Sequence, residues 1–252
     1  MPLYDFEAIF QLGSIDKNQA WGLIATVLEQ QGLVDPLYDQ MNRKMTFDRV
    51  ANSIRRYPKP HFGIYTERFT FDFGPIANPQ HTLLWVDQKS PCAVNWAHWV
   101  EHLSTVDGFL QAFYLDKEYS RWQTTDDIQS YELAGRVHAH LPKVSNNLPP
   151  PVERTIIDVT NNPGRRTIRL GFVEVVAAEM WLGPGFWELT GADRDEVEQC
   201  DYVQTEALAH DVLHLTAWPH PFASDQGEEG EVQHKMRRLL YPNSVDRPID
   251  EL

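Results

Sequence analysis

The sequence predicts an α+β fold, in which antiparallel sheets and helices occupy separate stretches of the chain. Three observations support this class. Some segments space their apolar residues three to four apart, as helices do, others alternate apolar and polar residues, as strands do, and turn residues separate the successive strands. The 252 residues are enough to bury a sizeable core. We therefore interpret residues 1–252 as one α+β domain.

The first 115 residues are expected to mix helices with strands. Apolar residues follow helical spacing from 16 to 31, and Gly32 can end that helix. Thr46 can cap a second helix, which Pro58 prevents from continuing far. Phenylalanines alternate with polar residues at 69–73, which predicts a strand. The elements expected next are a strand at 81–86, a helix at 93–104 and a strand at 109–115.

A Pro-rich stretch interrupts the middle of the chain. Residues 141–151 are typical of an extended connector, and a lobe boundary at 141–154 is the alternative to a single uninterrupted domain. Beyond it, segments 155–159 and 166–170 flank the turn sequence NNPG, which predicts a β-hairpin. The remaining expected elements are strands at 201–207 and 212–218 and a helix at 228–241.

The formal net charge of -14 limits the classes of partner. Such a charge repels phosphate backbones and anionic membrane surfaces, so we expect neither nucleic acid nor membrane as a partner, and a basic protein is the natural complement. No secretory signal and no membrane-spanning apolar stretch is evident, which favours a cytoplasmic protein. Cys92 and Cys200 are the only cysteines, which excludes a disulfide scaffold and a four-cysteine zinc site.

The strongest enzyme-like motif is HWVEH at 98–102, which matches the H-x-x-E-H pattern of zinc peptidases. His98 and His102 can face one metal ion from adjacent helical turns, and Glu101 can polarise a bound water. No downstream segment specifies a third ligand, however, and a packed helix explains the same pattern. We therefore expect no metal, no cofactor and no catalytic residue. A zinc-dependent metallohydrolase built on His98, Glu101 and His102 is the alternative function.

The acidic residues are concentrated in one quarter of the chain. Between Leu170 and His234 there are fourteen Asp and Glu residues and a single base, Arg194, whereas the remainder is near neutral. Concentrated like charge costs stability through self-repulsion, which favours a use in steering or specificity. An ordinary solvated surface is the alternative interpretation. The acidic residues that we expect to contact a partner are Asp193, Asp195, Glu196, Glu198, Asp201, Glu228, Glu229 and Glu231.

Aromatic residues lie within the same acidic region. Trp181, Phe186 and Trp187 flank the sequence GPG at 183–185, and aromatic anchors surrounded by charge are typical of protein-binding hot spots. We include these three side chains in the expected binding site. An isolated aromatic cluster also occurs in cores, which is the alternative.

The C-terminal third resembles the immunity proteins of bacterial polymorphic-toxin and type VI secretion systems, in the family paired with restriction-endonuclease-like nuclease toxins. The resemblance rests on MWLGPGFWELTG at 180–191, on LHL at 213–215 followed by Pro219 and PF at 221–222, and on a charged final helix. It implies a protein without catalytic activity that binds and neutralises a cognate toxin, a basic nuclease. An adaptor or chaperone that loads a secreted effector is a further alternative.

Overall fold

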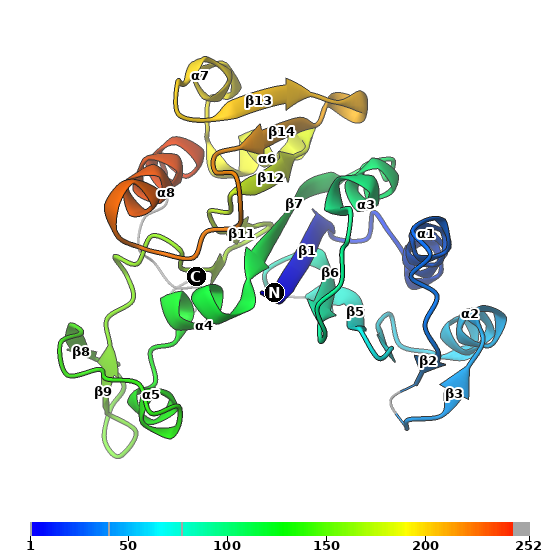
Figure 1. Cartoon of the computed structure of the whole chain (residues 1–252), viewed down its shortest axis with the longest axis horizontal. Helices are drawn as coiled ribbons and strands as arrows, with labels where there is room; N and C mark the ends of the chain where they lie inside the picture. The colour runs from blue at the N-terminus through cyan, green and yellow to red at the C-terminus, as the bar shows by residue number, and fades with distance from the viewer. Residues whose placement is uncertain (1, 40, 77, 244–252) are drawn as a thin grey trace.

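The computed structural model describes residues 2–39, 41–76 and 78–243, and it confirms the α+β class. A large antiparallel sheet dominates the structure, with strands in the order β13-β14-β12-β7-β1-β6-β5-β4-β2-β3 (Figure 1). These strands are β1 (Tyr4–Gln11), β2 (Leu37–Tyr38), β3 (Lys44–Met45), β4 (Phe62–Tyr65), β5 (Phe69–Ile76), β6 (His81–Gln88), β7 (Phe109–Asp116), β12 (Glu179–Leu182), β13 (Gln204–Ala207) and β14 (Leu213–Thr216).

The helices precede, follow and connect these strands. They are α1 (Lys17–Gln30), α2 (Phe47–Arg56), α3 (Trp96–Leu103), α4 (Lys117–Thr124), α5 (Ile128–Leu133), α6 (Pro184–Thr190), α7 (Arg194–Gln199) and α8 (Gly227–Leu240), with a single 3-10 turn at Ala209–Asp211. Within the predicted helix 16–31, Asp16 caps α1 by accepting from the backbone amides of Asn18 and Gln19. Thr46 caps α2 in the same way, as predicted.

The centre of the sheet is a strand that our sequence analysis did not predict. β1 pairs with β6 on one side and with β7 on the other, and strands from both sides of the Pro-rich connector belong to the same sheet because β12 pairs with β7. Alternate residues of β1 lie on opposite faces: Phe6, Ala8 and Phe10 face one core cluster, and Ile9 faces the other.

Helices cover the two faces of the sheet at different ends. On one face, buried side chains of α1, α2 and α3 pack against β1, β4, β5 and β6. On the other face, α6, α7 and α8 pack against β7, β12 and β14. Figure 1 shows the first group on the right and the second on the left and at the top. The predicted acidic region therefore forms its own end of the molecule.

The predicted hairpin of 155–159 with 166–170 is wrong. β9 (Thr155–Ile157) pairs with β8 (Lys143–Ser145), which lies within the Pro-rich connector, and β10 (Thr167–Ile168) pairs with β11 (Val173–Glu174). Each segment thus has its own partner in a separate two-stranded sheet. The turn residues between them contact α4 instead. The Asn162 side chain donates to the Gln123 carbonyl, and the Gly164 amide donates to the Gln123 side chain.

Candidate functional site

Residues 180–191, which carry the resemblance to immunity proteins, lie in β12, a tight turn and α6. Gly191 ends α6 in the left-handed conformation. Two glycines in this turn lie close against β7. A Cβ on Gly183 would overlap the carbonyl oxygen of Phe109, and one on Gly185 would lie 2.7 Å from a methyl carbon of Leu110. The aromatic-glycine pattern therefore has a structural cause, which is the close packing of the β12–α6 turn on β7.

Two of the three aromatic residues predicted to bind a partner belong to the core. Trp181 and Phe186 are completely buried, on opposite faces of the sheet. They cannot contact a partner while the fold is intact, so the prediction is wrong for these two residues. Both rings are apolar and are buried in the core. Trp187 is half-buried, and its ring lies 5.9 Å from the Arg194 guanidinium. Only Trp187 keeps a surface that a partner can contact.

Helix α7 follows directly and carries much of the acidic surface. Asp193 is its N-cap and accepts from the backbone amides of Asp195 and Glu196 at 2.9 and 3.3 Å. Val197 is buried and anchors the helix to the core. The Glu198 carboxylate pairs with Arg194 at 2.8 Å. Two of the predicted contact residues, Asp193 and Glu198, therefore already have intramolecular partners.

Helix α8 supplies the second part of this surface. Its buried side chains, including Met236 and Leu240, fix it against the sheet. Glu229 accepts from the backbone amides of Ala223 and Ser224 and so holds the loop before the helix. Glu228 and Glu231 are exposed. The helix thus presents two exposed carboxylates from a rigidly packed backbone.

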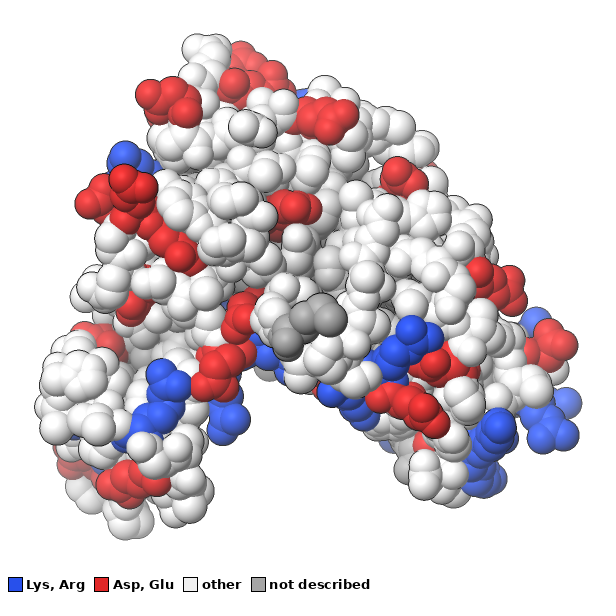
Figure 2. Space-filling view, in the orientation of Figure 1, with Lys and Arg blue, Asp and Glu red and all other residues white. Residues whose placement is uncertain are grey.

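Five of the eight predicted acidic residues are exposed, and their carboxylates have neither an ion pair nor a hydrogen bond within the part of the chain that the structure describes. We call them the acidic face: Asp195, Glu196, Asp201, Glu228 and Glu231. In Figure 2 acidic side chains gather at the top and on the left, over α7, β13 and α8. A shallow groove of about 460 Å³ lies at this end, lined by Asp193, Asp195, Glu196, Gln199, Cys200, Tyr202 and Leu239.

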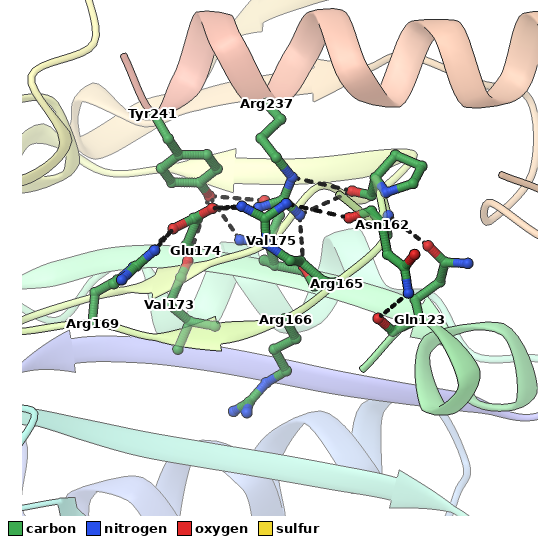
Figure 3. Close-up of polar contacts among 12 residues, drawn as sticks. Gln123, Asn162, Arg165, Arg166, Arg169, Val173, Glu174, Val175, Arg237 and Tyr241 are labelled. Carbon is green, nitrogen blue, oxygen red and sulfur yellow. Dashed lines mark hydrogen bonds and ion pairs between the residues drawn. The ribbon is translucent and has the colours of Figure 1, made fainter. Parts of the chain in front are cut away.

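One of the fourteen acidic residues lies inside the protein rather than on its surface. Glu174 is fully buried, and Figure 3 shows guanidinium groups converging on its carboxylate. Arg237 contacts it at 2.5 Å, Arg169 at 2.7 Å and Arg165 at 3.4 Å. Burial is the main cause that lowers the pKa of Arg237, and Arg165 adds to the shift. This cluster joins the 163–174 segment to α8 and so holds the helix in position.

The H-x-x-E-H motif lies on α3 and faces α1. The Nε2 atoms of His98 and His102 lie 2.7 and 2.8 Å from one atom, the side-chain oxygen of Gln30. Glu101 contacts Nδ1 of His98 at 2.8 Å. The amide of Gln30 therefore occupies the point on which the two imidazoles converge. Within the described ranges, no group of three or more His, Cys, Asp or Glu residues has a geometry that could hold a metal ion.

A further titratable cluster was missed by the sequence analysis. Asp5 on β1 lies directly opposite Asp87 on β6 in the strand register, and Lys117 pairs with Asp87. Burial raises the pKa of Asp5 to about 7. Lys117 opposes this shift, while Asp87 and Glu7 add to it. Like charges directly opposite each other destabilise a sheet. In the sequence, Asp5 and Asp87 are simply two acidic residues at strand ends. Only the strand register shows that they lie opposite each other.

Comparison with known proteins finds a similar fold among solved structures. Neither a protein-family model nor a curated protein matches this sequence. Among solved structures, a T6SS protein of Pseudomonas aeruginosa is similar, with a TM-score of 0.53 and 8% sequence identity over 95% of this chain and 73% of that chain. At this identity the likeness shows the fold alone. Among the described helices none is long and apolar enough to cross a membrane.

Proposed function

We propose that this chain is an immunity protein that binds and neutralises a cognate antibacterial toxin, a basic nuclease, through the acidic face. The observation that carries the proposal is the set of five exposed carboxylates on α7, the loop after it, and α8, for which the described residues offer no ion-pair partner. Both helices are fixed to the core, so the face needs little ordering when a partner binds. Preorganised charge of one sign steers a partner of opposite sign and fixes its orientation.

The fold likeness supports the same proposal. The similar solved structure is described as a T6SS protein, and such secretion systems deliver toxins against which the producing cell needs protection. The sequence resemblance in the C-terminal third leads to the same class of protein. We further propose that the protein acts in the cytoplasm, where a nuclease toxin meets its substrate, and that it acts by binding alone, without catalysis.

Trp187 supplies an apolar element beside the acidic face. Its ring is half-buried beside Arg194, and the neighbouring Leu189 is 40% exposed. Binding energy in protein interfaces concentrates on a few aromatic or apolar anchors within a polar rim. We propose that Trp187 and Leu189 form such an anchor and that the acidic face forms the rim. The anchor sets the residence time of the complex, and the rim sets its rate of formation.

Protection of living cells tests this function most simply. The candidate toxin is a basic nuclease domain, which the proposal expects to be encoded beside this chain; it is expressed in a bacterial host from an inducible promoter, with and without the chain. An immunity protein restores growth and binds the purified toxin directly. An adaptor that only loads the toxin for secretion binds it but leaves growth arrested, and that result would contradict the proposal.

A further inference from the structure

A basic patch lies at the opposite end of the molecule from the acidic face. Residues 43–59 contain six Lys and Arg residues and one Asp, in a chain whose net charge is -14. The patch is not evident from the overall composition, because the charge of the whole N-terminal part averages close to neutral. We call the following exposed residues of α2 and its flanks the basic patch: Lys44, Arg49, Arg55, Arg56 and Lys59.

The patch surrounds a hollow of about 690 Å³ beside α2. Lys44, Arg49 and Arg56 line it together with the polar side chains of Asn52 and Ser53. No ion pair joins these three cations to an acidic side chain anywhere in 2–39, 41–76 or 78–243, whereas the nearby Arg43 pairs with Asp39. The hollow therefore combines uncompensated positive charge with hydrogen-bond donors.

An apolar slot of about 250 Å³ adjoins this hollow. The two share Arg43, Ser53 and Tyr57, and the slot continues to the buried side chains of Ile54, Phe62 and Ile64. Met41 at its rim is 75% exposed, and Tyr57 is 42% exposed. Exposed apolar side chains of this size beside a recess are typical of surfaces that receive an apolar group from a partner.

We infer that the basic patch and the adjoining slot bind an acidic segment of a partner protein, with a bulky apolar side chain of that segment inserted in the slot. The charge selects for carboxylates, and the slot selects for an apolar anchor next to them. A nucleic-acid strand fits less well because it needs aromatic faces on which successive bases stack, and Tyr57 is the exposed ring in this lining. This inference does not depend on the proposed toxin contact, since α2 and α8 lie at different ends of the molecule (Figure 1).

Figure 2 shows basic side chains at the lower right, interspersed with a few acidic ones, while further acidic groups lie at the top and on the left. At physiological ionic strength the Debye length is about 8 Å, so the distant acidic face does not cancel the local potential of the basic patch. A partner bound at one end therefore leaves the other end accessible. The two surfaces can engage different partners or two parts of one.

Binding of defined probes to the full chain tests the inference. The probes are a fluorescein-labelled peptide of glutamates with one central Phe, the same peptide with Ser in place of Phe, and a single-stranded oligonucleotide of equal charge. Fluorescence anisotropy is expected to show the Phe peptide binding about tenfold more tightly than the Ser peptide or the oligonucleotide. Equal binding of the Ser peptide would contradict the insertion of an apolar side chain in the slot. Tighter binding of the oligonucleotide would contradict the inference that the partner is a protein.

Matched variants locate the binding. The double variant Arg49→Glu and Arg56→Glu is expected to lose at least about tenfold in affinity for the Phe peptide, and Met41→Ser several-fold. The control is Lys235→Glu with Arg238→Glu, two exposed cations on α8, which should change affinity by less than about twofold. Should a reversal unfold the chain, Arg49→Gln with Arg56→Gln and the salt dependence of wild-type binding give the same test. Unchanged affinity in a folded Arg49/Arg56 variant would overturn the inference.

Discussion

The indole ring of Trp181 stacks on the imidazole ring of His214, with ring centroids 4.8 Å apart and planes 2° from parallel. The two residues are direct partners in the β12–β14 ladder. Trp181 also stacks on Tyr114 of β7, so the ring joins three strands from the interior. A residue that appears from sequence to be a binding anchor is therefore part of what holds the β12–β14 part of the sheet together.

Truncation of this ring should reduce stability rather than recognition. Trp181→Ala is expected to lower the free energy of unfolding by about 3–5 kcal/mol, because it leaves a cavity among buried neighbours. Trp187→Ala should cost clearly less, since its ring is already partly in water. Urea denaturation of both variants measures the difference. If the free energy of unfolding fell less for Trp181→Ala than for Trp187→Ala, Trp187 and not Trp181 would be the more deeply buried ring.

The β12–α6 turn should tolerate no side chain at its first glycine. Gly183→Ala is expected to destabilise the protein by about 2 kcal/mol or more, because the new Cβ would overlap the Phe109 carbonyl oxygen and the backbone would have to shift. Gly22 on α1 is the matched control, because a Cβ there meets nothing within 4 Å. Gly22→Ala should stabilise the protein by up to about 1 kcal/mol through helix propensity. Thermal melts of the two variants should therefore shift in opposite directions.

Asp5 should make stability fall as pH rises toward neutral. Burial raises its pKa to about 7 in the folded protein, above the ordinary value of 3.8. Between these values the unfolded chain has lost the proton that the folded chain keeps, so the free energy of unfolding decreases with pH over that window and stays low above it. Asp5→Asn removes this effect and should be more stable than wild type at about pH 8, by at least about 1 kcal/mol, but not at about pH 4.

The measurement is urea denaturation of wild type and Asp5→Asn at both pH values. Glu67→Gln serves as the control, because Glu67 is exposed and no ion pair to it is found among the described residues. Its stability should follow the wild-type pH profile. A wild-type profile that is flat between about pH 4 and about pH 8, or one that Asp5→Asn leaves unaltered, would contradict the assignment to Asp5.

The H-x-x-E-H motif should hold no stoichiometric zinc. The Gln30 amide already lies at hydrogen-bond distance from both imidazoles, Glu101 contacts the outer Nδ1 atom of His98, and the described residues contain no group of three or more His, Cys, Asp or Glu that could hold a metal ion. Elemental analysis of the purified protein is expected to find zinc far below one equivalent. Near-equimolar zinc that disappears in His98→Ala would restore the metallohydrolase alternative. Peptide hydrolysis by the zinc-containing wild type would refute the account of a binding protein.

Local signals in the sequence predicted most of the helices and strands of the first 115 residues. Thr46 as a cap and the alternating phenylalanines of β5 depend on neighbours within a few residues, which the sequence displays directly. β1 shows the same alternation only from Tyr4 to Ala8, after which Ile9 and Phe10 interrupt it. The pairing of β9 with β8 was not predictable, because two compatible partners lay close in sequence and tertiary packing selected the other one.

The candidate site was predictable only as a region. Composition identified the acidic quarter of the chain, but it could not separate Glu174, which binds arginines as far away in sequence as Arg237, from the exposed Glu231. The roles of Asp193 and Glu229 as backbone acceptors also depend on three-dimensional placement. Averaging charge over long segments hid the basic patch on α2.

Association kinetics with the cognate toxin test the central claim, that the acidic face binds it. The test variant replaces Asp195, Glu196, Asp201, Glu228 and Glu231 with Lys. The control replaces Glu29, Glu67 and Asp107, exposed carboxylates outside the acidic face, with Lys. Stopped-flow mixing at about 0.15 M and about 1 M salt compares the association rates of both variants with that of wild type. The Debye length falls from about 8 Å to about 3 Å over this range.

The account predicts that the acidic-face variant associates at least about tenfold more slowly than wild type at low salt, that high salt removes most of this difference, and that the control variant stays near the wild-type rate. Circular dichroism should show both variants folded. An acidic-face variant that is folded, associates at the wild-type rate and protects cells as well as wild type would contradict the account, because the toxin contact would then lie elsewhere on the molecule.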